Sequence, residues 1–226
     1  MRRRAILLED KLERYRAILD AAERLLLRSP ARPANMEEVA DEAGLAKGTV
    51  YLYFPSKEGL LLALHERNID GLFQALTTLL DGEATVTIAD VAAVMHERMV
   101  NPPLFLPLAS RCVALMDRRF ARRLSKRLER AGASLQRHFD ALTREQAVAL
   151  LSNSYALVIG LWQIAGSESG QQLKRAMIAL WEGTLPADAA RGLAESAGDP
   201  DRLAGDAPIR GRAQEYDRIG DVAARR

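Results

Sequence analysis

A short stretch of the sequence, residues 47–57, gathers side chains suited to contacting nucleic acid. It supplies two cations, a bare backbone and three hydroxyls, from Lys47, Gly48, Thr49, Tyr51, Tyr53 and Lys57. Such groups suit phosphates and the edges of bases. The two tyrosines have an alternative role as core aromatics with exposed hydroxyls, and Phe54 is expected to be buried.

The residues around this stretch have the spacing of a helix-turn-helix, in which two short helices cross closely. Ala40 is small enough for that approach, Gly44 can take a positive φ in the turn, and Val50 is an apolar anchor for the second helix. The motif covers about residues 35–54. A helical hairpin with a glycine turn and ordinary packing would show the same pattern, so the spacing alone leaves both interpretations open.

The segment AGLAKGTVYLYFPSKEGLL resembles the DNA-binding signature of the TetR family of bacterial transcriptional regulators. The likeness begins at AILDAAERLLL and runs to about Leu64. It implies a three-helix DNA-binding head, a helical C-terminal domain that dimerises, and a ligand cavity that controls DNA affinity. It also implies phosphate or base contacts for Thr49, Tyr51, Tyr53 and Lys57, and a major-groove position for Lys47 and Gly48.

Two positions depart from the family pattern. Ala46 stands where many members have Ser, so a hydroxyl that caps the recognition helix is missing, a loss of about 1 kcal/mol in a typical helix. Asn35 stands where Thr is frequent, but Asn caps a helix as well as Thr does. At the N-terminus, Arg2, Arg3 and Arg4 either form an arm that reaches the minor groove or have no role.

Helical periodicity without two-residue alternation predicts an all-α fold. The resemblance implies that this fold is TetR-like. We expect an N-terminal three-helix helix-turn-helix DNA-binding domain at 9–65 and a C-terminal helical bundle for ligand binding and dimerisation at 66–185. A first helix covers about 9–28, a helix at 104–116 is kinked at Pro107 or begins there, and a last helix covers about 171–183. Residues 186–226 contain few large apolar side chains, which predicts a mostly disordered tail.

Charge is uneven along the chain, although the total is only +2. Residues 35–110 sum to −7, and residues 111–137 sum to +7. The predicted helix at 118–130 therefore has a strongly basic polar side. A second nucleic-acid or acidic-lipid surface is one interpretation, and a solvated face, which we favour, is the other.

Dimerisation is expected through about residues 146–182, where apolar residues exceed the needs of one small core and Ser152, Ala156 and Gly160 would let helices approach. The stretch 146–167 is uncharged, but its central Ser and Asn residues favour a helix buried in protein over one that spans a membrane. The ligand site remains unknown. Candidate lining residues are Phe105, Cys112, Met116, Tyr155 and Trp162, with Arg111, Asn153 and Gln163 as polar groups.

Catalysis is not expected, because the sequence contains none of the common nucleophile, zinc-protease, P-loop or dinucleotide motifs. The single cysteine, Cys112, rules out an internal disulfide framework and multi-cysteine metal sites, so we expect no metal, no cofactor and a cytoplasmic location. The sequence thus predicts a homodimeric, ligand-responsive repressor that binds a pseudo-palindromic DNA operator. The alternative is an architectural DNA-binding protein of the same fold without ligand response.

Overall fold

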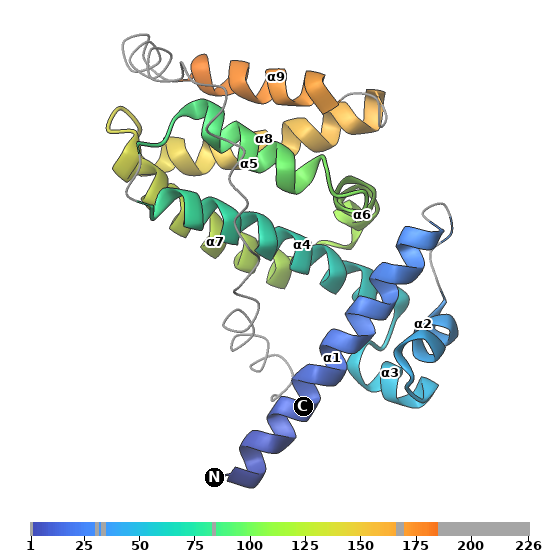
Figure 1. Ribbon diagram of the computed structural model, residues 1–226. Coiled ribbons are helices and arrows are strands. Elements are labelled where there is room, and N and C mark those ends of the chain that lie inside the picture. Colours follow the sequence, from blue (N-terminus) through green and yellow to red (C-terminus); the bar gives the residue numbers. More distant parts are fainter. Residues whose placement is uncertain (1, 30–31, 33–34, 83–84, 166–169, 185–226) are drawn as a thin grey trace. The chain divides into compact units, whose positions relative to one another are not determined.

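The computed structural model describes residues 2–29, 32, 35–82, 85–165 and 170–184, and these residues form helices without any strand (Figure 1). The helices in chain order are α1 (Arg2–Arg28), α2 (Met36–Ala43), α3 (Lys47–Tyr53), α4 (Lys57–Leu80), α5 (Ile88–Met99), α6 (Phe105–Cys112), the 3-10 turn η1 (Val113–Leu115), α7 (Arg118–His138), α8 (Arg144–Ala165) and α9 (Gly170–Glu182). The all-α prediction is confirmed. The predicted tail at 186–226 lies outside the described residues.

The described residues divide into two compact units, one ending at Leu64 and the other beginning at His65. In the N-terminal unit α1 packs on α2 through apolar residues such as Ile18, Leu19 and Val39, which are at most 1% exposed. Arg24 and Arg28 of α1 form ion pairs with Glu42 at the end of α2. These pairs, with Arg28 the larger cause, lower the pKa of the Glu42 carboxyl to about 2.

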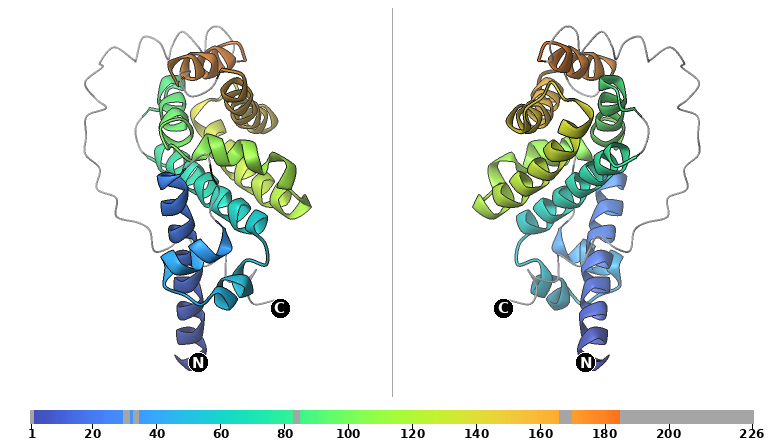
Figure 2. Two further views of the ribbon diagram at one scale, coloured as in Figure 1. Left: turned by 90° about the vertical axis from the view of Figure 1, so that its right-hand side faces the viewer. Right: turned by 90° about the vertical axis from the view of Figure 1, so that its left-hand side faces the viewer.

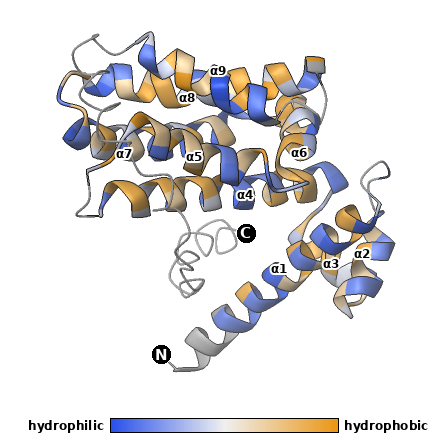
Figure 3. Cartoon of the chain, turned by 45° about the horizontal axis from the view of Figure 1, so that its top comes forward, coloured by the Kyte–Doolittle hydropathy of each residue, from blue (hydrophilic) through white to orange (hydrophobic). Residues whose placement is uncertain are grey.

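In the C-terminal unit α8 and α9 lie side by side, and α8 also packs on α7 (Figure 2). Gly132 makes the close approach of α7 to α8 possible, because a Cβ there would lie 2.7 Å from Cγ2 of Val148. A glycine that weakens an isolated helix therefore serves tertiary packing here. Hydrophobic residues recur along the helices of this unit among hydrophilic ones (Figure 3).

Polar residues in the apolar helix α8 have partners inside the fold. The Ser154 hydroxyl donates to the Leu150 carbonyl, 2.8 Å away, and accepts from the Trp181 indole N–H of α9, also at 2.8 Å. By length and composition alone residues 144–164 could cross a membrane, with 33% of the best window buried inside the protein. The serine and tryptophan contacts instead tie α8 to α9 within the unit.

Several helix ends differ from those predicted. Helix α1 begins at Arg2 rather than near residue 9, and the chain has no proline or glycine in between to interrupt it. Helix α6 ends at Cys112 and passes into η1, and Asp117 then caps α7 by accepting from the Phe120 N–H at 2.7 Å. Pro107 lies in the first turn of α6, where a helix loses no internal hydrogen bond to proline.

Candidate nucleic-acid interface and ligand cavity

The turn between α2 and α3 is fixed by local hydrogen bonds at both ends of α2. Asn35 accepts from the Glu38 N–H at 2.8 Å, and the Glu38 carboxylate accepts from the Asn35 N–H at 3.0 Å. At the other end Gly44 adopts φ 65°, which strains any residue with a Cβ, and the Leu45 N–H donates to the Ala40 carbonyl at 2.9 Å. Ala40 itself is 2% exposed, as a close helix crossing requires.

Helix α3 is anchored by one face and open on the other. Val50 is fully buried, and Phe54, 4% exposed, packs against Tyr15 of α1 with the two rings tilted and their centroids 5.1 Å apart. Ala46, the residue before α3, provides no side-chain hydrogen bond to the helix start. The anchored face thus orients α3 although its first turn has no side-chain cap.

The open face of α3 carries the exposed residues Lys47, Gly48, Tyr51 and Leu52. Tyr51 is 42% exposed, so its ring lies on the surface rather than in the core. Leu52, at 84% exposed, was not among the predicted site residues. Leu52 lies two positions from each of the buried residues Val50 and Phe54. A residue two positions away points to the opposite side of a helix, so this spacing could have identified Leu52 as exposed.

The remaining predicted contact residues surround this face. Thr49 and Tyr53 are half-buried on α3, and Lys57 is half-buried at the start of α4. Lys47 forms an exposed ion pair with Glu37 of α2, with 3.2 Å between Nζ and Oε2. A Cβ on Gly48 would meet no heavy atom of the described residues within 4 Å, so the backbone is bare on its outer side.

The predicted arm at Arg2–Arg4 has helical backbone, since α1 already begins at Arg2. The structure describes the backbone of these three residues and not the positions of their side chains. The backbone of this segment therefore differs from a flexible extension.

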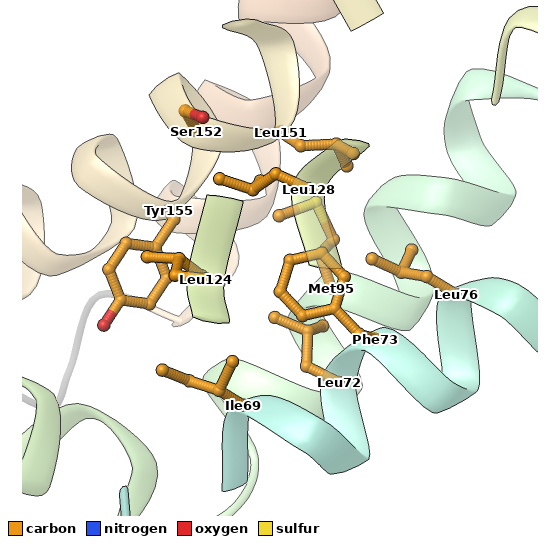
Figure 4. Close-up of a pocket in the computed structure, with 10 residues that line it drawn as sticks. All are labelled: Ile69, Leu72, Phe73, Leu76, Met95, Leu124, Leu128, Leu151, Ser152 and Tyr155. Atoms are coloured by element: carbon orange, nitrogen blue, oxygen red, sulfur yellow. The ribbon is translucent and has the colours of Figure 1, made fainter. Parts of the chain in front are cut away.

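A cavity of about 180 Å³ lies within the C-terminal unit (Figure 4). Helices α4, α5, α7 and α8 line it through Ile69, Leu72, Phe73, Leu76, Met95, Leu124, Leu128, Leu151, Ser152 and Tyr155. Hydroxyls in this lining come from Ser152 and Tyr155. The Ser152 hydroxyl donates to the Val148 carbonyl of its own helix at 2.9 Å, so it is already engaged.

The Tyr155 hydroxyl contacts a fully buried histidine of α4. Its oxygen lies 2.8 Å from Nε2 of His65, whose ring stands edge-on to Phe105 with centroids 5.5 Å apart. Burial lowers the pKa of His65 to about 4, so the imidazole is neutral near pH 7, and burial raises the pKa of Tyr155. The pair is therefore an uncharged hydrogen-bonding unit.

Of the candidate ligand-lining residues, Tyr155 alone lines this cavity. Phe105 and Cys112 are core residues at most 1% exposed, and burial raises the pKa of the Cys112 thiol to about 11. The Gln163 amide donates to Ser110 at 3.0 Å. The remaining members, Arg111, Met116, Asn153 and Trp162, are exposed or half-buried and lie outside the lining.

The basic helix α7 is partly neutralised by α4. Arg123 forms an ion pair with Glu66, with 2.6 Å between Nη2 and Oε1, and Arg127 pairs with Asp70. Near the other end of α7, Arg137 pairs with Asp81 at 2.7 Å. Burial, opposed by Arg123, raises the pKa of Glu66. The pairs with Glu66 and Asp70 tie together two walls of the cavity.

A short helix with an exposed face, docked through a glycine turn on a capped helix, has the geometry of a DNA-binding helix-turn-helix. Residues 18–64 match the family described as bacterial regulatory proteins, TetR family, and residues 66–194 match the tetracyclin repressor-like C-terminal domain. The chain belongs to the TetR family of DNA-binding transcriptional regulators.

Similarity to individual regulators is concentrated in part of the chain. The HTH-type transcriptional regulator EthR of Mycobacterium tuberculosis is 40% identical over 72 residues, which are 32% of this chain and 33% of EthR. The HTH-type transcriptional activator FasR of Mycolicibacterium smegmatis is 36% identical over 81 residues, 34% of this chain and 37% of FasR. The match thus spans about a third of the length of these relatives.

Solved structures share the fold over a larger part of the chain. A TetR-family regulator from Streptomyces coelicolor gives a TM-score of 0.52 at 21% identity, covering 76% of this chain and 99% of that one. A candidate TetR-family regulator from Mesorhizobium loti gives 0.53 at 23% identity, covering 76% and 95%. At these identities the likeness concerns the fold alone.

Proposed function

We propose that the protein is a ligand-responsive transcriptional repressor that binds a pseudo-palindromic operator as a homodimer in the cytoplasm. The observation that carries this proposal is the outward face of α3, where Tyr51 and Leu52 are exposed although they are large and partly apolar. Exposed aromatic and aliphatic side chains on a short helix suit the thymine methyl groups and base edges of a major groove.

The residues around α3 divide into base-reading and phosphate-binding roles. Tyr51 and Leu52 lie on the face that would enter the groove, and Gly48 lets the DNA backbone approach the helix closely. Lys47, Thr49, Tyr53 and Lys57 supply the charge and hydroxyls that fix the register on phosphates. Lys47 would exchange its surface ion pair with Glu37, which costs little in water, for a phosphate contact.

Dimerisation is assigned to the outer face of α8 together with α9. On α8, Ile164 is 86% exposed and Ala156 is exposed, and a Cβ on Gly160 would meet no heavy atom of the described residues within 4 Å. These residues favour close packing against a second copy. A two-fold axis there would present two copies of α3 to successive major grooves, which requires an inverted repeat in the DNA.

Ligand response is assigned to the cavity because helix α4 forms one of its walls. The same helix begins at Lys57, next to the helix-turn-helix, and its residues up to Leu64 belong to the N-terminal unit. A ligand that binds more tightly when α4 is shifted would lower the affinity for DNA. The decrease cannot exceed the ligand's difference in affinity between the two positions of α4.

Selection of bound sequences from a random DNA duplex pool tests this proposal. We expect enrichment of an inverted repeat at near-physiological salt, and binding without enrichment would contradict it. Leu52→Ala should weaken binding to the selected repeat about tenfold, within the range for one base contact. Val113→Ala is the matched control, since Val113 is also exposed, at 52%, but lies in η1.

The exposed basic residues of α7 are the observation that supports the alternative function, an architectural DNA-binding protein. A protein of that kind would bind duplexes of any sequence, and small molecules would not raise its thermal stability. Ligand stabilisation that grows with concentration therefore separates the two functions.

A further inference from the structure

Helix α3 (Lys47–Tyr53) lacks the side chains that most often identify a base through hydrogen bonds. Its sequence, KGTVYLY, contains no Arg, Asn or Gln, the residues that bond guanine or adenine through two atoms at once. Its hydroxyls come from Thr49, Tyr51 and Tyr53, and a hydroxyl both donates and accepts, so it fits more than one base. Hydroxyl contacts from α3 therefore discriminate poorly between base pairs.

The cation of α3, Lys47, stands at the start of the helix beside an acidic side chain. Its Nζ lies 3.2 Å from Oε2 of Glu37. A guanine presents two acceptor atoms to a lysine, and a carboxylate next to them would repel both. Residues 2–64 contain eleven basic and ten acidic side chains, so their total charge gives this unit little attraction for DNA of arbitrary sequence. Specific binding must then come largely from contacts with the bases.

An aliphatic side chain occupies the middle of the outer face of α3. Leu52 is 84% exposed and points away from the fully buried anchor Val50. Gly48, one helical turn before Leu52 on the same side, carries no side chain that could stand beside it. Leucine has no polar atom, so it gains free energy in a major groove only by covering apolar surface. The groove offers such surface at the C5-methyl group of thymine.

We propose that Leu52 determines the sequence specificity of the protein by packing against the C5-methyl group of one pyrimidine in each half of the operator. In unmodified DNA this pyrimidine is thymine. The inference rests on the proposed function, because it requires α3 to enter the major groove. It also implies that the protein distinguishes 5-methylcytosine from cytosine at this position, since the added methyl group stands on the same ring carbon as in thymine.

The first test removes single methyl groups from the DNA and leaves the protein unaltered. Each thymine of the selected inverted repeat is replaced in turn by uracil, which lacks only the C5-methyl group, and fluorescence anisotropy gives the affinity of the full chain. At one thymine in each half of the repeat we expect the replacement to lower the affinity about fourfold, the value of one buried methyl group. Changing both halves should lower it about fifteenfold. A scan in which no thymine responds would overturn the proposal.

Variants of α3 show which side chain reads the methyl group. Leu52→Ala should bring the ratio of thymine to uracil affinity close to one, and Leu52→Met, which restores an apolar side chain of similar volume, should keep it near four. Tyr51→Ala is the matched control, because Tyr51 is the exposed neighbour on α3; it should weaken binding and leave the ratio unchanged. A ratio that survives Leu52→Ala, or is lost in Tyr51→Ala, would refute the assignment to Leu52.

Cytosine provides a second measurement on the unaltered protein. Where the responding thymine is replaced by cytosine, with guanine opposite, methylation of that cytosine at C5 should raise the affinity about fourfold. Equal affinity with and without the methyl group would contradict the proposal. Failure of the proposed function is distinguishable, because it shows earlier, as a random pool without an enriched repeat, and the role of Leu52 would then fall with it. An enriched repeat that binds equally well without its methyl groups would leave the regulator standing and overturn only the role of Leu52.

Discussion

Replacing Gly48 by Ala should stabilise the protein and at the same time weaken its binding to DNA. A Cβ at this position meets no heavy atom of the described residues within 4 Å, so the methyl group fits the free protein. Alanine in a helix is favoured over glycine by roughly 0.5–1 kcal/mol. Because Gly48 is only the second residue of the seven-residue helix α3, we expect the lower end, about 0.5 kcal/mol.

The same methyl group would stand on the face that is proposed to meet the DNA. If the bare backbone there contacts a phosphate, the methyl separates the two by more than a hydrogen bond tolerates. Loss of that contact should weaken operator binding about tenfold, or about 1.4 kcal/mol. Stability and affinity thus change in opposite directions, which no general defect in folding produces.

Two measurements on each variant check this prediction: denaturant unfolding of the free protein and fluorescence anisotropy with the selected operator at constant salt. Gly71→Ala is the matched control, because Gly71 lies inside helix α4 and a Cβ there also meets no heavy atom of the described residues within 4 Å. The control should gain stability and keep its affinity for DNA. A Gly48→Ala protein that binds as tightly as the control would refute the proposed approach of DNA to α3.

Three further predictions concern stability. Ala46→Ser should add the missing cap of α3 and raise the free energy of unfolding by about 1 kcal/mol, and no gain in denaturant unfolding would contradict this. Gly132→Ala should lower the free energy of unfolding by about 1–3 kcal/mol, because the new Cβ would lie 2.7 Å from Val148. Unchanged stability would disprove the close packing of α7 on α8. His65 has a pKa of about 4 when folded against 6.5 ordinarily, so the unfolded chain binds the extra proton between these values. The free energy of unfolding should therefore rise by about 3 kcal/mol as the pH rises through that window. Denaturant unfolding at a series of pH values should show this rise in the unaltered protein and not in His65→Asn.

Local signals in the sequence predicted the DNA-binding unit closely because the interactions that shape it are local. The Asn35 cap and the Gly44 turn each depend on residues within a few positions, and both are formed as expected. Capping boxes are also formed at Thr87 with Asp90 and at Thr143 with Gln146, three residues further along in each case. Backbone hydrogen bonds at helix ends are satisfied by near neighbours, so their residue types are informative without a tertiary structure.

The cavity could not be predicted in this way because it depends on residues from four helices that meet only after folding. Phe105 and Cys112 were chosen for their chemistry, yet tertiary packing places them in the core. Ile69, Phe73 and Leu124 look like ordinary core residues in the sequence, and they line the cavity. The helical spacing that brings a residue inward is the same whether it meets another side chain or an open space.

The sequence could not decide the role of the basic helix α7, and the structure narrows the question to its exposed cations. Arg123, Arg127 and Arg137 are satisfied by acidic side chains of the C-terminal unit, so their charge serves the fold. Exposed residues Arg118, Arg122 and Lys126 recur every four positions and show no ion pair within the described part of the chain. Either these three residues contact DNA, or they form a solvated surface that binds no partner.

We expect the solvated role, and the salt dependence of operator binding decides it. Each phosphate contact contributes about 0.9 to the slope of log affinity against log salt. Replacing Arg118, Arg122 and Lys126 together by Gln should leave the slope unchanged, whereas Lys57→Gln, at the proposed phosphate contact, should lower it by about 0.9. A fall of two or more in the triple variant would extend the DNA interface to α7 and favour the architectural function, because three cations distant from α3 in sequence would then hold the duplex without reading its bases.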